Sequence, residues 1–405
     1  MRIAHVNTEA YRGGAARMAL SLVEALHAQG QDVCLYHGSD NLRESSKRGL
    51  KRFGSRYINA LAARLGGSMT VFDMGFADEL LNLTADCDIL HIHNLHGYYI
   101  NYRKLLLGWK DRPIVWTWHD QWGSVGRCGI PNSECDRWEN GCGHCPLKEV
   151  YPRAWLDWSA EEYRFKSAIY HELKKLLIVT PSTWLKERAI IRGFSPDRVR
   201  IIPNPVNAQA FKLQNKQQVR HKLGLPENQP LLLFVSADCN DPRKGYKDFA
   251  KLVQETGISG VVVGVPPELR LPSITYTDVI KNQMHMNDYY SACDLLINTT
   301  YADNFPNVNV EAMAAGMGVL AYNVGGIPDQ LPEFWDGLVP LGDVAVLIQS
   351  CLKHISNPHE LSTLSIKFRE HAVSKFDSSL IAKKYIEAYR DVSKFQPFPA
   401  VYPSL

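Results

Sequence analysis

The sequence lacks long apolar runs. No stretch of about eighteen apolar residues occurs anywhere in the 405 residues, so we expect no helix that spans a membrane. The first ten residues, MRIAHVNTEA, contain neither a long apolar core nor a small-residue cleavage site, so no secretory signal is visible. These absences predict a cytoplasmic protein.

A strong charge of either sign is also missing. The formal net charge is +3, which excludes a global field for polyanions and argues against a nucleic acid partner. One segment, residues 42–66, nevertheless carries seven basic residues against the single acid Glu44. Its apolar residues recur at helical spacing, which is typical of an amphipathic helix. Such a helix fits an anionic membrane surface at the inner membrane face, and it fits equally well a solvated helix that packs on its own domain.

Apolar strands alternate with helical patterns along the whole chain. This alternation predicts an α/β fold with parallel sheets covered on both faces. Prolines and asparagines interrupt the pattern at RIIPNPVNAQAF, which indicates a linker with a hinge near Asn204 to Asn207. We therefore predict two doubly wound domains in series, followed by an amphipathic helix that packs back on one of them. The expected ranges are 1–200 with an insert at 123–150, a linker at 201–211, a second domain at 212–377, and a C-terminal helix and tail at 378–405.

Polar groups follow several predicted strands of the first domain. Gly13 and Gly14 follow the first strand and open a helix, where a backbone can approach an anionic ligand closely. His119 ends the strand PIVWTWHD, and three tryptophans around it suggest a surface for sugar faces. An imidazole tied to its own loop is an equally good interpretation of His119. Ser182 is a further strand-end hydroxyl.

The second domain carries two polar loops at strand ends. Arg243 and Lys244 follow LLLFVSADCND, and a cationic pair in such a loop can neutralise a diphosphate without a metal. The segment YADNFPNVNVEAMAAG follows the strand DLLINTT and places acids at Asp303 and Glu311. Between these acids lies a polar loop before a helix start, and its backbone amides are candidates to bind a ligand: Asn304, Phe305, Asn307 and Val308.

Four of the nine cysteines cluster in the insert. Cys128, Cys135, Cys142 and Cys145 follow the pattern C-x6-C-x6-C-x2-C in a Gly- and Trp-rich stretch. Four thiolates at such spacing could close around structural zinc, which would order a loop that has little core of its own. Reduced thiols without a ligand, or a redox-sensitive pair, remain open alternatives.

Taken together, these residues resemble retaining glycosyltransferases of family 4. The resemblance covers nearly the whole chain and is carried by GGAA, WHDQW, TPSTWL, PNPV, the RKG loop, GGIPD and, most specifically, DNFPNVNVEAMAAGMGVLA. It implies the GT-B architecture, in which two Rossmann-like domains face each other across a cleft. The cysteine-rich insert looks like that of bacterial exopolysaccharide transferases of the colanic acid type.

The resemblance also implies roles for individual residues. His119 would contact the donor sugar, Arg243 and Lys244 would hold the diphosphate, and Glu311 would hold the ribose. Asp303 stands where the family usually has a glutamate, which affects donor identity. The implied partners are a UDP- or GDP-sugar donor and a glycan or lipid-linked glycan acceptor, with no cofactor required for catalysis. A non-catalytic binding subunit or an epimerase of the same fold are the alternatives.

Overall fold

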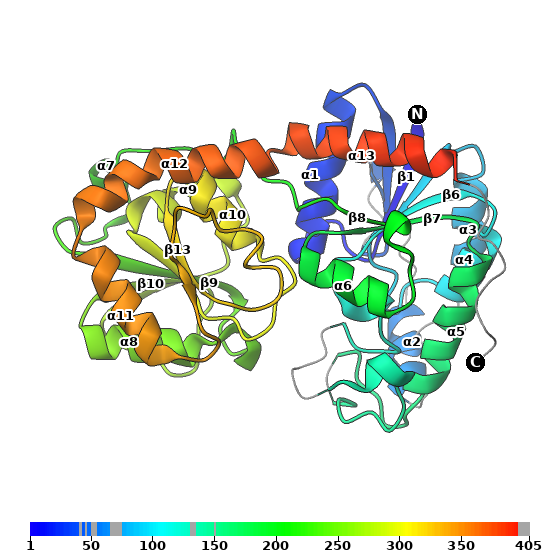
Figure 1. Ribbon diagram of the computed structural model, residues 1–405, viewed down its shortest axis with the longest axis horizontal. Coiled ribbons are helices and arrows are strands. Elements are labelled where there is room, and N and C mark those ends of the chain that lie inside the picture. Colours follow the sequence, from blue (N-terminus) through cyan, green and yellow to red (C-terminus); the bar gives the residue numbers. More distant parts are fainter. Residues whose placement is uncertain are drawn as a thin grey trace. The chain divides into compact units, whose positions relative to one another are not determined.

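The computed structural model describes residues 1–39, 43–44, 47–49, 55–64, 75–129, 135–149 and 151–395. The chain divides into two compact units (Figure 1). The first contains residues 1–202 together with the C-terminal segment from Ile381 onward, and the second contains Pro203–Leu380. Among the described helices we find none whose length and apolarity would let it cross a bilayer.

The first unit is built on an eight-stranded sheet. Its strand order is β3-β4-β2-β1-β5-β6-β7-β8, and all neighbours are parallel except β3 and β4. The strands are β1 (Arg2–Asn7), β2 (Asp32–His37), β3 (Arg43–Glu44), β4 (Lys47–Gly49), β5 (Ile89–Ile92), β6 (Pro113–Thr117), β7 (Lys175–Thr180) and β8 (Val199–Ile201).

Alternate residues of these strands enter two separate cores. On one face, Ile3 and Ile89 pack with α1 (Gly14–Ala28) and α13 (Ser378–Ser393). The other face packs against helices that follow later strands: α3 (Phe76–Leu83), α4 (Tyr102–Gly108), α5 (Ser159–Glu172) and α6 (Thr183–Ile191). This two-sided burial explains why the strands read as nearly continuous apolar runs. The predicted packing of the C-terminal helix on one of the two domains is confirmed, and the domain is the first, since α13 joins its core.

The basic segment 42–66 differs from its prediction where the structure describes it. Residues 43–44 and 47–49 form β3 and β4 at the sheet edge, and only α2 (Ser55–Arg64) is helical. The prediction of one amphipathic helix was therefore wrong for the first part of the segment, where β4 makes its backbone hydrogen bonds to the neighbouring strand β2. Leu61, on the predicted apolar face, is exposed. The remaining residues of this prediction lie outside the described ranges.

The second unit holds a six-stranded parallel sheet. Its order is β11-β10-β9-β12-β13-β14, with the strands β9 (Leu231–Asp238), β10 (Ser259–Val265), β11 (Ile274–Thr277), β12 (Leu295–Asn298), β13 (Gly318–Tyr322) and β14 (Leu338–Val339). One core cluster fills this unit. Its helices are α7 (Lys216–Leu223), α8 (Tyr246–Thr256), α9 (Gln283–Ala292), α10 (Asn307–Ala314), α11 (Val344–Ile355) and α12 (Pro358–Phe376).

The predicted hinge is anchored within the second unit. The amide of Val206 donates to the carbonyl of Phe376 at 2.8 Å, and the amide of Ser378 donates to Val206 at 3.0 Å. The side chain of Asn204 donates to Asn307 Oδ1 at 2.8 Å. The two segments next to the unit boundary are thus hydrogen-bonded to each other.

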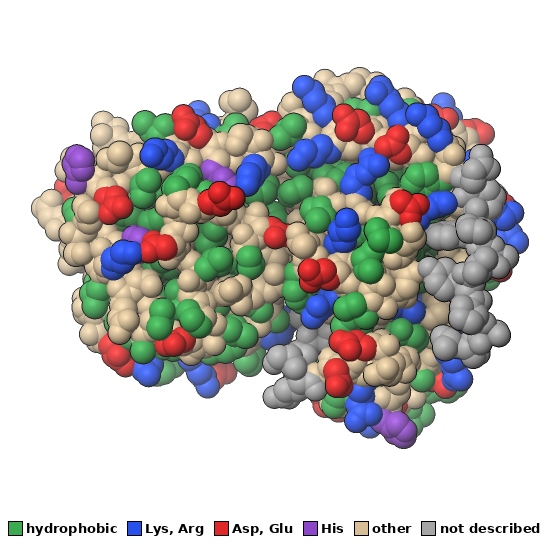
Figure 2. Space-filling view, viewed as in Figure 1, with side chains coloured by type: hydrophobic (Ala, Val, Ile, Leu, Met, Phe, Trp, Pro, Cys, Tyr) green, Lys and Arg blue, Asp and Glu red, His purple; other side chains and the backbone are tan. Residues whose placement is uncertain are grey.

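Charges of both signs are interspersed over both units on the face shown in Figure 2, as the small net charge suggests.

Candidate functional site

The second unit brings two predicted site residues into direct contact. Lys244 ends the short helix η4 (Pro242–Lys244) after β9, and Asp303 lies in the loop after the adjacent strand β12. The Lys244 Nζ atom donates to Asp303 Oδ2 at 2.8 Å. Both side chains are partly exposed, at 30% and 22%. The structure therefore places a cation and an anion side by side at the carboxyl edge of the sheet, where open α/β sheets bind ligands.

Backbone contacts join the two loops that carry these residues. The amide of Tyr301 donates to the carbonyl of Arg243 at 2.7 Å, and the Thr299 hydroxyl donates to the carbonyl of Gly245 at 2.8 Å. Gly245 has φ +71, and a Cβ atom there would overlap the Thr299 carbonyl oxygen. Only glycine allows this close approach without strain. The loops therefore hold Lys244 and Asp303 in register.

Arg243 has a local partner that the sequence analysis missed. Its guanidinium donates to both carboxylate oxygens of Asp241, at 3.1 and 2.6 Å. Asp241 also caps η4 by accepting from the amide of Arg243 at 3.0 Å. The spacing D-x-R just before a short helix was the available signal. This fork pre-orients the arginine, and 43% of its side chain stays exposed to meet an anion.

The start of α10 presents backbone amides beside the same loop. Pro306 precedes the helix, and as its first two residues Asn307 and Val308 have no intrahelical acceptor for their amides. The Phe305 amide donates to Asp303 Oδ1 at 3.2 Å, so it orients the acid in this structure. Asn304 and Phe305 are buried. The helix dipole adds to the positive potential at this end.

A buried amide network that was not predicted fixes this helix start. Asn298 donates to Asn309 Oδ1 at 2.8 Å, Asn309 donates to Gln330 Oε1 at 2.9 Å, and Gln330 donates to the carbonyl of Pro306 at 3.0 Å. All three amide side chains are buried. Because a buried network of this kind is costly to break, it holds the loop before α10 in one conformation.

Glu311 lies one turn further along α10 and is buried. Its Oε2 atom accepts a hydrogen bond from the hydroxyl of Tyr290 at 2.9 Å. Tyr290 lies on α9, and no sequence pattern connects it with this acid. The contact keeps the carboxylate in one orientation.

The first unit holds the other predicted residues. Gly13 has φ +90 and ψ 168 at the start of α1, a conformation that favours glycine, and nothing lies within 4 Å of the position of a Cβ atom. Gly14 is the first residue of that helix. Ser182 is buried, and its hydroxyl caps α6 by accepting from the amide of Leu185 at 3.3 Å.

His119 follows β6 and is half-buried. Its Nε2 atom lies 2.8 Å from Nδ1 of His93, and the two rings stack. Burial lowers the pKa of His119 to about 4, although the negative charge of the neighbouring Asp120 acts to raise it. The ring is therefore neutral near pH 7, and it is tied to a second ring rather than only to its own loop.

The tryptophans around His119 were interpreted wrongly. Trp116, Trp118 and Trp122 are each 2% exposed and pack in the core, so they cannot offer a face to a sugar. The interpretation failed because adjacent helices cover this face of the sheet as well. His96, which was not singled out, instead has its Nε2 atom 2.8 Å from Asp120 Oδ2, within hydrogen-bonding distance. Burial alone would raise the pKa of Asp120, but His96 and the Trp122 amide hold it below its usual range.

Three histidines form the one group in the described ranges whose ligand atoms all lie within 4.8 Å of one another. They are His5, His91 and His93. The His5 Nδ1 and His93 Nε2 atoms are 2.9 Å apart. Tetrahedral zinc with Zn–N bonds of about 2.0–2.1 Å would separate two nitrogens by roughly 3.3 Å. The distance fits a hydrogen bond better than a shared metal.

The four cysteines of the insert line one small cavity. Cys128 is buried, and the other three, Cys135, Cys142 and Cys145, are half-buried. Their sulfurs do not form a group of three within 4.8 Å in the described part of the chain. The amide of Gly126 donates to Cys142 Sγ at 3.2 Å. Burial raises the pKa of Cys128 to about 12.

A fully buried lysine closes the base of the insert. Lys166 Nζ donates to the carbonyls of Trp122, Val125 and Gly126 at 2.6, 3.0 and 3.1 Å. It also lies 3.5 Å from the centre of the Trp122 ring. Apart from η2 (Arg137–Asn140), the described residues of the insert have little regular structure, and their apolar cluster consists of Val125, Cys128 and Trp138 with few neighbours. The insert therefore depends on contacts other than a core of its own.

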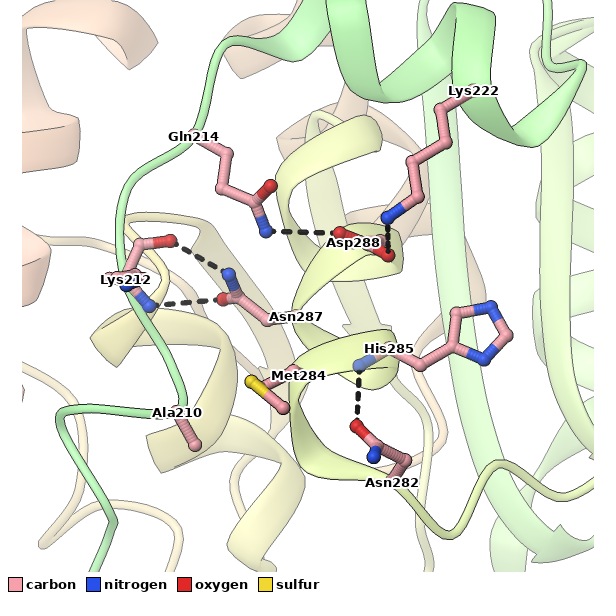
Figure 3. Close-up of a pocket in the computed structure, with 9 residues that line it drawn as sticks. All are labelled: Ala210, Lys212, Gln214, Lys222, Asn282, Met284, His285, Asn287 and Asp288. Atoms are coloured by element: carbon pink, nitrogen blue, oxygen red, sulfur yellow. Dashed lines mark hydrogen bonds and ion pairs between the residues drawn. The ribbon is translucent and has the colours of Figure 1, made fainter.

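A cavity of the second unit lies elsewhere. It has a volume of about 640 Å³ and is lined by residues from the segment 210–222 and from α9 with the residue before it, as Figure 3 shows. Its polar groups pair with each other: Lys222 and Gln214 both contact Asp288, and Asn287 exchanges two hydrogen bonds with the backbone of Lys212. None of the predicted site residues lines it. The paired groups argue against a site for a charged ligand there.

Comparisons with known proteins match both halves of the chain. Residues 12–210 match the family model described as Glycosyltransferase Family 4, and residues 229–357 match the model described as Glycosyl transferases group 1. WcaC of Escherichia coli strain K12, a candidate glycosyl transferase of colanic acid biosynthesis, is 23% identical over 415 residues, which cover 97% of this chain and 100% of that protein.

Solved structures share the fold over almost the full length. Sucrose-phosphate synthase from Thermosynechococcus elongatus superposes with a TM-score of 0.69 at 19% identity, covering 96% of this chain and 98% of the other. Alr3699/HepE of Anabaena, solved in complex with UDP-glucose, gives a TM-score of 0.67 at 16% identity, covering 96% and 100%. The predicted fold, GT-B with two Rossmann-like units, is confirmed.

Proposed function

Since this chain belongs to glycosyltransferase family 4, we propose that it transfers a hexose from a nucleotide-sugar donor to a glycan in polysaccharide biosynthesis, with retention of the anomeric configuration. The name of the Escherichia coli relative supports the polysaccharide role, and the neighbour solved with UDP-glucose supports a nucleotide-sugar donor. The observation that carries the proposal is the arrangement of Lys244, Arg243 and the start of α10 around the loop of Asp303.

This arrangement suits a diphosphate leaving group. When the bond between the anomeric carbon and the phosphate oxygen breaks, negative charge grows on the diphosphate. Lys244, Arg243 and the amides of Asn307 and Val308 are fixed positive groups that stabilise this charge, so no divalent metal is required. Asp303 accepts hydrogen bonds from donor-sugar hydroxyls once Lys244 turns to phosphate. Glu311 holds the ribose hydroxyls of the nucleotide.

The first unit supplies the remaining contacts in this proposal. Gly13 and Gly14 allow the substrate to approach the backbone at the start of α1, and His119 hydrogen-bonds the donor sugar. Ser182 keeps the start of α6 in place through its cap. Retention follows if the acceptor hydroxyl attacks the face from which the diphosphate leaves. Its oxygen then bonds to the anomeric carbon, and its proton passes to the departing phosphate.

A nucleotide screen followed by a transfer assay tests the proposal. We expect UDP- or GDP-sugars, without added metal, to raise the melting temperature of the native chain, since binding to the folded state stabilises it. The nucleotide base whose sugar derivatives raise the melting temperature identifies the donor class. In the transfer assay, run with free and with lipid-linked glycan acceptors, Lys244→Ala should lose most activity, whereas the exposed neighbour Lys247→Ala on α8 should keep it. Equal activity in the two variants would overturn the site assignment.

Two other functions give different results in the same assays. A non-catalytic subunit that binds sugar nucleotides would be stabilised by them without releasing any nucleoside diphosphate. An epimerase with this fold would convert the donor sugar without needing an acceptor. Release of nucleoside diphosphate that depends on the acceptor therefore supports transfer against both alternatives.

We propose a lipid-linked acceptor at the inner membrane face. The basic residues of segment 42–66 are the observation that supports it, because they would attract anionic lipids. Arg52→Glu combined with Arg56→Glu should weaken binding to vesicles containing anionic phospholipid and leave binding to neutral vesicles unchanged. Wild-type binding of the double variant to anionic vesicles would remove the membrane role from this segment.

We also propose that the four insert cysteines hold structural zinc. They line one cavity in a segment with little core, and an amide hydrogen bond to Cys142 Sγ would stabilise a thiolate there. Protein purified without chelators should contain about one zinc per chain by elemental analysis, and Cys142→Ser should contain far less. The half-buried Cys34→Ser serves as the matched control and should keep its zinc. Metal well below one per chain, with all thiols titratable, would leave reduced cysteines as the correct interpretation.

A further inference from the structure

A continuous chain of hydrogen bonds connects the C-terminal helix with His119. It runs through the core of the first unit and involves seven side chains, which in order of contact are Tyr385, Thr117, His91, Tyr389, His5, His93 and His119. The six contacts measure 2.7–3.4 Å, and the longest joins Tyr389 Oη to His5 Nε2. All members except His119 are buried.

The strand pairing explains why these side chains meet. His5 on β1 is in register with His91 on β5. His91 in turn is in register with Val115 on β6, so Thr117 and His93 lie two residues further along the same face. Residues two apart share a face of the sheet. This is the face that α13 covers, and α13 contributes both tyrosines.

The histidine rings of the chain are neutral near pH 7. Burial lowers the pKa of His5 to about 3 and lowers the pKa values of His91 and His93 well below the usual range. A neutral imidazole has one nitrogen that donates and one that accepts. Each of the seven groups therefore brings one mobile proton to the chain.

Seven protons and six contacts leave one proton over. If every contact contains one proton, and the buried hydroxyls of Thr117 and Tyr389 donate within this chain of hydrogen bonds, all donors point the same way and the extra proton lies at one end. Tyr385 is fully buried, and among the described residues its hydroxyl has Thr117 as its hydrogen-bond partner. A hydroxyl proton there would be buried without an acceptor, which is costly. His119 is half-buried at the end of its strand, so the extra proton is cheaper to place there.

We infer that this chain fixes His119 as the tautomer protonated at Nδ1. Tyr385 donates to Thr117, Thr117 to His91, His91 to Tyr389, and so on to His93, which donates from Nδ1 to His119 Nε2. His119 Nε2 is then an acceptor, and its second ring nitrogen, Nδ1, carries the proton. His93, His5 and Tyr389 are positioning residues, since they act through His119.

The assignment deepens the proposed function and rests on it only for its chemical consequence. With the proton on Nδ1, His119 offers a hydrogen bond to an oxygen of the substrate and cannot take a proton at that atom. The residue would orient a sugar oxygen rather than act as a general base. The tautomer itself follows from the core of the first unit and does not depend on the substrate.

Nitrogen NMR of the full chain tests the tautomer directly. In protein labelled with ¹⁵N-histidine, correlations between ring nitrogens and carbon-bound ring protons distinguish the two tautomers, and the ring that disappears in His119→Gln is His119. We expect wild-type His119 to be protonated at Nδ1. A wild-type ring protonated at Nε2 would overturn the inference without any further variant.

Two replacements of His93 test whether the chain of hydrogen bonds sets the tautomer of His119. His93→Phe removes the donor to Nε2 and should move the His119 proton to that nitrogen. His93→Gln retains a donor and an acceptor and should preserve the Nδ1 proton. The exposed His285→Gln, outside the chain, should leave the spectrum of His119 unchanged. A folded His93→Phe protein that keeps the Nδ1 proton would show that the chain does not set the tautomer.

Discussion

Lys244 and Asp303 form an ion pair of 2.8 Å between the loops that follow two adjacent strands, β9 and β12. The pair joins a cation and an acid that lie 59 residues apart in the sequence. Because both groups are partly exposed, the pair contributes on the order of 0–1 kcal/mol to stability. The pair lies at the edge where open α/β sheets bind ligands, so its position bears on the proposed function more than its contribution to stability does.

Replacing Asp303 should affect activity far more than folding. Asp303→Asn removes the charge that holds Lys244 and replaces one of the two accepting oxygens by an NH2 donor, so we expect kcat/KM to fall at least about tenfold, equivalent to about 1.4 kcal/mol. Asp303→Glu keeps the charge and should lose less. Steady-state transfer kinetics and melting temperatures measure both effects, with the exposed Asp278→Asn as the control. Wild-type kinetics in Asp303→Asn would contradict the assignment.

Glu311 should be needed for nucleotide affinity. Glu311→Gln keeps an oxygen that accepts from Tyr290 but loses the charge that strengthens hydrogen bonds to ribose, so we expect the Kd for the stabilising nucleotide to rise about tenfold. Isothermal titration calorimetry measures the change. Tyr290→Phe is the matched variant, since it removes the intramolecular partner and keeps the carboxylate. If only Tyr290→Phe weakened binding, Glu311 would act as a structural residue.

Gly325 should tolerate no side chain. It has φ +58, and an added Cβ atom would overlap the carbonyl oxygen of Asp303. Gly325→Ala should therefore shift the loop, lower stability by about 1–3 kcal/mol and reduce transfer activity. Gly257→Ala is the control, because Gly257 also has a positive φ, +69, but has no atom within 4 Å of its Cβ position. Chemical denaturation of the two variants separates the cost of the steric overlap from the cost of backbone strain. Equal losses of stability in Gly325→Ala and Gly257→Ala would mean that backbone strain alone is responsible.

Acid should destabilise the first unit through its buried histidines. Their pKa values are lower in the folded chain than the usual 6.5, so the unfolded chain binds more protons below that pH. The stability that these neutral histidines contribute is present above pH 6.5, and it is lost as the pH falls towards their pKa values in the folded chain. For His5, with a folded pKa of about 3, the loss between pH 6.5 and 5 is about 2 kcal/mol.

Denaturation curves at several pH values check this dependence. The slope of unfolding free energy against pH should become shallower in His5→Gln, which cannot titrate. The exposed His359→Gln should keep the wild-type slope. A slope in His5→Gln as steep as that of the wild type would mean that other groups cause the acid sensitivity.

Local patterns predicted the main strands because buried parallel strands need short apolar runs, and DVCLYH and LLLFVSAD supply them. These local patterns gave wrong predictions where the structure of a segment depends on contacts with residues far away in the sequence. The segment KRG reads as part of a basic helix, yet it pairs with β2 at a sheet edge. The three tryptophans near His119 read as a sugar platform, yet they lie in a core shared with α4 and α5.

The sequence by itself determined the two doubly wound units and the strand-end loops that carry Arg243, Lys244, Asp303 and Glu311, since apolar periodicity and turn residues act over a few neighbours. Only the tertiary structure decided which polar groups meet. The pairing of Lys244 with Asp303 depends on strand order in the sheet, and the chain from Tyr385 to His119 depends on strand register and on the return of α13. Such contacts join residues from distant positions, and buried polar groups must find their partners in three dimensions.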